Sequence, residues 1–114
     1  MKRLTKNQYE KCVAHYTRMI TWAEKQSKRK RYQNCFDMED EMDEAINESC
    51  CGYHCCLCRR YGEGYCQNCP LYINGYGCNE SISPWKSMRY SLTWPKLIKG
   101  ARKMLEIFEE LKPL

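Results

Sequence analysis

The sequence predicts a mainly α fold, in which about three helices surround a cysteine-rich loop region with at most a small β-hairpin or knuckle. Two observations lead to this prediction. Stretches in both flanks of the chain repeat apolar residues every three or four positions, the spacing of one buried helix face. The intervening stretch "CCLCRRYGEGYCQNCPLYINGYGC", positions 55–78, instead holds six cysteines and closely spaced glycines, which favour turns.

The chain length of 114 residues is sufficient for one domain with a modest core. We expect a single domain over 1–114, made of an N-terminal helical pair (1–49), cysteine-rich loops (50–80) and a C-terminal helical part (81–114). Roughly a third of the apolar residues are Cys or Met, so the ordinary aliphatic core is thin. Something other than apolar burial is therefore expected to help hold the fold.

The first helix is predicted to begin after Thr5, which forms a capping-box pattern with Gln8. The residues predicted to form its buried face are Tyr9, Cys12, Val13, Tyr16, Met19, Ile20 and Ala23.

The second helix is predicted from about Cys35 to Glu48, with Gly52 as the stop just beyond it. Acidic residues at its beginning favour the positive end of the helix dipole. Its apolar stripe is predicted to comprise Cys35, Met38, Met42, Ala45 and Ile46.

The C-terminal part is predicted to contain a short helical turn and a long helix. Ser83 suits the cap of the turn and Pro84 its first residue. The last helix should run from about Trp94 to Lys112. Its predicted inner face consists of Leu97, Ile98, Ala101, Leu105, Phe108 and Leu111.

The ten cysteines are interpreted through the compartment that the sequence indicates. The chain has no apolar run long enough for a membrane helix, and its basic start is not followed by the apolar segment of an export signal. We therefore expect a cytoplasmic protein without a membrane partner. Disulfides are disfavoured in a reducing compartment, where clustered thiols more often bind metal. Disulfides and unliganded thiols remain the minor alternatives.

The spacing of the cysteines predicts a metal site. Cys55 and Cys58 form one C-x-x-C pair, Cys66 and Cys69 form a second, and Cys78 follows. A two-residue gap lets a tight turn place both sulfurs on one side of the chain, near the separation required around one tetrahedral ion. Zinc is favoured. An iron–sulfur cluster is the alternative, because thiolates alone serve either centre and "CQNCP" ends in a Cys-Pro pair.

Five cysteines compete for four places around this ion. Cys55, Cys58 and Cys69 are the firmest predicted ligands, while Cys66 and Cys78 compete for the remainder or share it.

Other potential ligands lie beside the two pairs or far from them. A second ion using Cys50, Cys51 or Cys56 remains open. His54 is interpreted as lying outside the ligand set, because it cannot easily bind the same ion as the adjacent cysteine. His15 is interpreted as a structural or solvated side chain of the first helix.

Charge is distributed unevenly along the chain. Residues 1–34 carry a net charge of +8, residues 35–49 carry −7 and residues 50–114 carry +4. The densest basic run, "KQSKRKRYQ", could contact the phosphate backbone of a nucleic acid. Its candidate binding residues are Lys25, Lys28, Arg29, Lys30 and Arg31. The alternative is that the acidic segment neutralises this run when the two pack together.

A resemblance to a group of viral proteins extends over roughly residues 55–111. The pattern of "CCLC", "CQNCPLY", a glycine-containing loop to Cys78, "SPW" and a final Ala-Arg-Lys-Met-Leu helix resembles small cysteine-rich proteins encoded by bacteriophages and prophages. In those proteins the first pair commonly reads C-P-L-C and the second C-x-x-C-P. Here Cys56 stands where Pro is common, which leaves open whether Cys56 joins the metal site. The resemblance implies a viral or mobile-element origin, and hence a host cytoplasm, but no activity.

The sequence does not predict an enzyme. It contains no H-E-x-x-H, no H-x-E followed by P-C-x-x-C, no P-loop and no G-x-S-x-G. A catalytic zinc also keeps an open position for water and usually takes His or carboxylate ligands, whereas the predicted ligands are all thiolates. The leading interpretation is a zinc-binding module that binds or inhibits a host protein. The alternatives are a basic nucleic-acid-binding regulator and an iron–sulfur or thiol redox protein.

Aromatic residues of the cysteine-rich loops are the candidates for contacting a protein partner. Neighbouring glycines leave little bulk to bury these rings, and aromatic side chains commonly dominate interface energetics. The candidates are Tyr61, Tyr65, Tyr72 and Tyr76. Trp94 is instead expected in the core, because it begins the last helix. The oligomeric state is not predicted.

Overall fold

The computed structural model describes residues 3–49, 71, 74 and 84–114. Within these residues it contains four helices and no strand: α1 (Lys6–Ala23), α2 (Cys35–Ile46), α5 (Pro84–Arg89) and α6 (Trp94–Glu110). The prediction of a mainly α fold is confirmed. The predicted hairpin or knuckle beside the cysteines lies outside the described residues.

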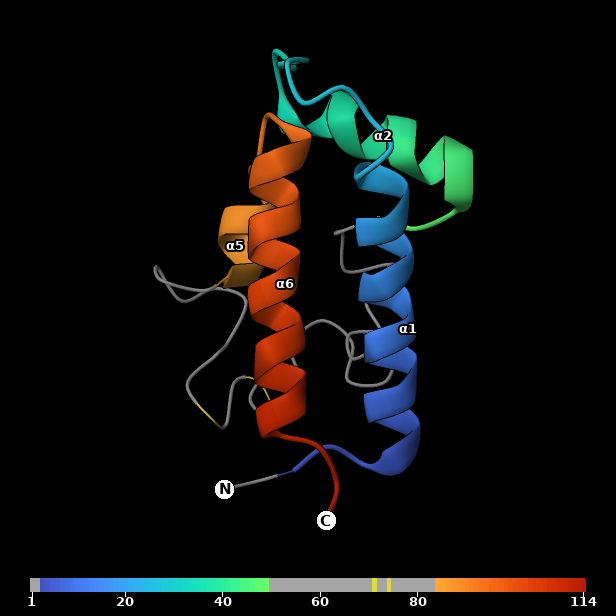
Figure 1. The fold of residues 1–114 in the computed structure, drawn as a ribbon, viewed down its shortest axis with the longest axis vertical. Helices are drawn as coiled ribbons and strands as arrows, with labels where there is room; N and C mark the ends of the chain where they lie inside the picture. Colours follow the sequence, from blue (N-terminus) through green and yellow to red (C-terminus); the bar gives the residue numbers. More distant parts are fainter. Residues whose placement is uncertain (1–2, 50–70, 72–73, 75–83) are drawn as a thin grey trace.

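The two long helices form the frame of the molecule. Figure 1 shows α1 and α6 side by side and running in opposite directions, with α2 across the end where α1 finishes and α6 begins. The short helix α5 packs against α6. Both chain termini lie at the opposite end of the α1–α6 pair.

Helix α1 begins as its local sequence predicts. The Thr5 hydroxyl accepts a hydrogen bond from the Gln8 backbone N–H at 3.1 Å, and the Gln8 side chain accepts one from the Thr5 N–H at 2.9 Å. This reciprocal pair satisfies two backbone donors that the first turn leaves open. The buried face is turned slightly from the predicted one, because Gln8 and His15 are buried while Tyr9 and Val13 are only partly covered.

Helix α2 begins at the predicted residue but ends before the predicted stop. The Asn34 side chain caps its start by accepting a hydrogen bond from the Asp37 N–H at 2.9 Å. The helix ends at Ile46, and the next residue, Asn47, caps it with a φ of 56°, in the left-handed region. Asparagine adopts this conformation more readily than most residues, and it terminates helices in the same way as glycine. The helix therefore stops before Glu48 and Gly52, and Ala45 is exposed instead of buried.

Helices α5 and α6 are joined by an unusually close contact. Pro84 is the first residue of α5, as predicted, whereas its predicted cap Ser83 lies outside the described residues. A Cβ atom added to Gly100 of α6 would lie 2.9 Å from the Cβ of Met88 in α5. Glycine at this position thus lets the two helices approach each other.

Helix α6 begins at Trp94, as predicted, and ends at Glu110, two residues before the predicted end. Its inner face also differs in part from the prediction, since Met104 and Ile107 are buried while Ile98 and Leu105 are only partly covered.

One hydrophobic core joins all four helices. Its largest enclosed side chains include Tyr16, Phe108 and Trp94, and the rings of Tyr16 and Phe108 pack edge to face at 5.2 Å between centroids. Leu71, from the cysteine-rich segment, is only 2% exposed and belongs to the same core. That segment therefore contributes at least one side chain to the packing of the helices.

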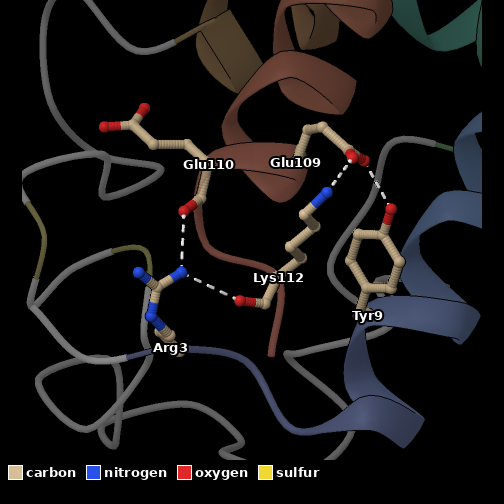
Figure 2. A network of polar contacts seen from close by, with 5 residues as sticks. All are labelled: Arg3, Tyr9, Glu109, Glu110 and Lys112. Atoms are coloured by element: carbon tan, nitrogen blue, oxygen red, sulfur yellow. Dashed lines mark hydrogen bonds and ion pairs between the residues drawn. The ribbon is translucent and has the colours of Figure 1, made fainter. Parts of the chain in front are cut away.

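The two ends of the chain are held together by polar contacts (Figure 2). The Arg3 guanidinium donates to the backbone oxygens of Glu110 at 3.5 Å and Lys112 at 3.0 Å. The Glu109 carboxylate accepts hydrogen bonds from the Tyr9 hydroxyl and from the Lys112 ammonium, the latter at 2.9 Å. These bonds raise the pKa values of Tyr9 and Lys112 and lower that of Glu109. These contacts join the start of α1 to the end of α6. Because they lie at the surface, each single ion pair contributes little stability.

Candidate functional site

The predicted metal ligands and loop tyrosines are not among the residues that the structure describes. They are Cys55, Cys58, Cys66, Cys69, Cys78, Tyr61, Tyr65, Tyr72 and Tyr76. In the described ranges there is no group of three or more His, Cys, Asp or Glu residues that could hold a metal ion. The metal site and the tyrosine surface therefore stay predictions.

The two described cysteines differ from each other. Cys12 on α1 is fully buried and disulfide-bonded, and its partner cysteine is not among the described residues. Cys35 at the start of α2 is a buried free thiol, with the Arg89 guanidinium 3.8 Å from its sulfur. The expectation of reduced thiols is thus wrong for Cys12. The periodicity of α1 predicts that Cys12 lies on the buried face, but it gives no information about a second cysteine to which Cys12 could bond.

A buried polar network lies beside Cys12 on the same face of α1. His15 is 4% exposed, and its Nδ1 contacts the Glu48 carboxylate, whose other oxygen accepts a hydrogen bond from Nε of Arg18. The interpretation of His15 as a structural side chain is confirmed, and the solvated alternative is wrong. Glu48 and the neighbouring Ser49 are both buried. The chain is therefore anchored to α1 immediately before the cysteine-rich segment.

The five predicted basic residues are all exposed in the loop between α1 and α2. Lys30 pairs with Glu41 of α2 at 3.2 Å and lies over the Tyr32 ring at 4.8 Å from its centre. Hydrogen bonds with Tyr32 and Glu41 raise the pKa of Lys30. Lys25, Lys28, Arg29 and Arg31 form no ion pair with any described residue. The idea that α2 neutralises this loop therefore holds, within the described chain, for Lys30 only.

Helix α6 adds a second set of basic side chains at the same end of the molecule. They are Lys96, Lys99, Arg102 and Lys103, all at least partly exposed. Arg102 reaches the end of α1, where it pairs with Glu24 at 3.2 Å. We call these four residues and the five basic loop residues the basic surface. Sequence reasoning missed the contribution of α6, although bases repeating every three or four residues with no acid between them are a readable signal.

A pocket of about 320 Å³ opens within the basic surface, between the end of α1 and the first turns of α6. Ala23 and Trp94, each 1% exposed, form its floor. Exposed charged side chains, Glu24, Lys28 and Arg102, line its rim. The remaining lining residues are Pro95 and Ile98. The pocket thus combines the apolar side chains of Pro95 and Ile98 with an edge of two cations and one carboxylate.

Trp94 is held in place by Tyr32 of the loop between α1 and α2 and by Trp22 of α1. The Trp94 indole N–H donates to the Tyr32 hydroxyl at 3.1 Å, and that hydroxyl donates to Glu41 at 2.6 Å. The Trp22 ring packs perpendicular to it, with 4.9 Å between centroids. The bond from Tyr32 lowers the pKa of Glu41, while burial raises the pKa of Tyr32. The expectation that Trp94 belongs to the core is confirmed, and these contacts hold the residue beneath the pocket.

Comparison with models of protein families, with curated proteins and with solved structures returns no match. None of the helices in the described part of the chain is long and apolar enough to cross a membrane.

Proposed function

We propose that this protein is a non-enzymatic, zinc-binding interaction module, encoded by a phage or prophage, that binds or inhibits a host protein in the host cytoplasm. The target class is nucleic-acid machinery or a defence system. The supporting observation is the shared core, in which Leu71 of the cysteine-rich segment packs with the four helices. Because segment and helices pack together, a metal that orders the thiols would also support the helical surface.

The proposed ligands are drawn from the two C-x-x-C pairs and from Cys78. A structural zinc site contributes about 10–16 kcal/mol of apparent free energy at neutral pH, against about 5–15 kcal/mol for the whole stability of an ordinary domain. In the described core, five Met and two Cys side chains are buried beside six Leu and Ile side chains. Zinc would add to the stability that this core provides.

Metal analysis and absorption spectroscopy of protein purified without oxygen test this proposal. Zinc close to one ion per chain without visible absorption is the expected result. Iron with a broad visible band would instead favour the iron–sulfur or redox alternative. Protein that contains neither metal would contradict the proposal.

A second candidate, a nucleic-acid-binding regulator, is favoured by the extent of the basic surface. Nine exposed bases come from the loop and from the first turns of α6, and Lys28 of the loop and Arg102 of α6 line the same pocket. Exposed bases of this kind are common in proteins that bind phosphate backbones. Its signature is an affinity for generic DNA or RNA that falls steeply with salt, because bound Lys and Arg release condensed counterions. Replacement of Lys28, Arg29 and Lys30 by Gln should then reduce the salt slope by roughly one unit per lost contact.

A further inference from the structure

We propose that the Trp94 pocket is a docking site for an acidic peptide segment of the partner protein. One apolar side chain of that segment enters the pocket, and its carboxylates face Lys28 and Arg102. This inference rests on the proposed protein-binding function, but it is independent of which metal the cysteines bind.

The size and lining of the pocket fit a single side chain. Its volume of about 320 Å³ is at the lower end of the range of roughly 300–1,000 Å³ typical of ligand pockets. Pro95 and Ile98 offer apolar surface, while Ala23 and Trp94, each 1% exposed, lie beneath it. An anchor residue buried in such a pocket is the usual source of binding energy at a protein interface.

The support behind the pocket indicates that it is preformed. Trp94 is tied through Tyr32 to Glu41, and Glu41 also pairs with Lys30. This chain links α6, the basic loop and α2. A docking segment would therefore meet an ordered surface, which limits the entropy cost of binding.

Charge complementarity selects an acidic occupant. Lys28 has no ion pair with a described residue, and Arg102 pairs with Glu24 across a solvent-exposed contact that a stronger carboxylate partner can displace. Arg102 can also bind a carboxylate with two parallel hydrogen bonds, which gives direction as well as attraction.

The pocket favours a peptide over a nucleic acid. Single-stranded nucleic acids bind by stacking bases on exposed aromatic faces, but Trp94 is 1% exposed. A phosphate backbone would gain nothing from the apolar side chains of Pro95 and Ile98. An acidic peptide with an apolar residue uses both these side chains and the cations.

Selection from a random peptide library tests the inference even though the partner protein is unidentified. The full-length protein, purified with its native metal, serves as the target. Enriched peptides should share an apolar or aromatic residue within two positions of Asp or Glu. A synthetic copy of one such peptide should lose at least tenfold in affinity, measured by fluorescence anisotropy, when its apolar residue is changed to Ala.

Matched variants of the protein assign the binding to the pocket. The double variant Lys28→Gln/Arg102→Gln should weaken peptide binding at least tenfold. The control Lys6→Gln/Lys11→Gln removes the same charge from exposed positions at the other end of α1, and it should change affinity less than twofold. Circular dichroism of both variants checks that the helices are retained.

Three outcomes would overturn the inference. The first is that no peptide is enriched. The second is that the enriched peptides lack acidic residues, or that their binding is unaffected by Lys28→Gln/Arg102→Gln. The third is that a 20-base-pair duplex DNA binds more tightly than any selected peptide. The metal content of the same samples separates this result from the proposed function. Pocket-dependent peptide binding without metal contradicts only the zinc module, whereas a zinc protein without such binding contradicts only the docking site.

Discussion

At the scale of single residues, Gly100 lacks a side chain at the point where α5 and α6 come closest. Its Cα faces the backbone and Cβ of Met88, with the N and Cα of Met88 each 3.2 Å from where a Cβ would stand. Glycine in a helix interior ordinarily costs about 1 kcal/mol relative to alanine. The close packing of α5 on α6 therefore outweighs the low helix propensity of glycine.

Gly100→Ala should lower the free energy of unfolding by about 1–3 kcal/mol, because the new methyl group has to displace backbone atoms of α5. Urea denaturation measures the change. Lys103→Ala, on the exposed side of the same helix, should leave the midpoint nearly unchanged. An unchanged or raised midpoint for Gly100→Ala would show that α5 does not pack this closely.

Glu48 is a second residue whose role depends on its neighbours. Its two oxygens bind side chains of α1, His15 and Arg18, at a position that is 9% exposed. Glu48→Gln keeps the shape but removes the negative charge, and it should cost about 1–3 kcal/mol. Thermal unfolding followed by circular dichroism tests this. Glu44→Gln, at an exposed position of α2, is the control, and equal effects of the two changes would contradict the prediction.

At the scale of elements, the Trp94–Tyr32–Glu41 chain couples three segments. The Tyr32 backbone N–H also donates to the Leu92 oxygen at 2.9 Å, which fixes the basic loop against the start of α6. The pocket therefore depends on how the loop is positioned as well as on the helix that carries Trp94.

Tyr32→Phe should destabilise the protein by about 1–3 kcal/mol at neutral pH, because it leaves the buried Trp94 N–H without its acceptor and removes a bond to Glu41. The pKa of Glu41 is lowered in the folded protein, so its stabilising contribution is present above its ordinary value of 4.5 and is lost as pH falls through the folded value. Tyr32 has a raised pKa, so its contribution is present below its ordinary value of 10.0 and is lost as pH rises through the raised value.

The difference in unfolding free energy between the native protein and Tyr32→Phe should therefore be largest between about pH 5 and pH 10 and should shrink below about pH 4. Urea unfolding at a series of pH values measures it. Tyr90→Phe, at a residue 57% exposed, provides the control. A difference that stays constant from pH 3 to pH 7 would exclude the proposed coupling to Glu41.

At the scale of the whole molecule, helices and cysteine-rich segment are expected to unfold as one unit. Leu71 belongs to the same core as Trp94 and Phe108, and Cys12 connects the centre of α1 to a second sulfur. Because the segment and the helices share one core, a change at the thiols should also destabilise helices that contain none of the proposed metal ligands.

Removal of metal by a chelator should therefore reduce helix content as well as the order of the cysteine-rich segment. Ser substitutions at Cys55, Cys58 or Cys69 should reproduce the loss. Cys12→Ser should also be destabilising, since this sulfur is fully buried and bonded, whereas Cys35→Ser at the free thiol should be milder. Circular dichroism and thermal unfolding with and without reductant measure these effects. A metal-free protein with an unchanged thermal transition would contradict the proposed metal site.

Local sequence was sufficient to predict the mainly α class and the starts of the helices. Thr5 with Gln8, the acidic residues that begin the second helix and Pro84 are local signals, because each acts on backbone groups within a few residues. The Asn34 cap is a further local signal that the prediction does not use. Asn47 could also have been found as the end of α2, but glycine at position 52 was the stronger signal in the sequence.

Which helix faces meet, and what they form, depends on tertiary packing. The sequence places Trp94 in the core as the start of the last helix and leaves His15 either structural or solvated. It does not show that Glu48 binds His15 or that Tyr32 binds Trp94. In the same way, the pocket joins Lys28 to Arg102, which are far apart in the chain. The physical reason is that helix spacing specifies a direction around the helix axis, whereas a site requires the distance between side chains on different elements, and packing alone sets that distance.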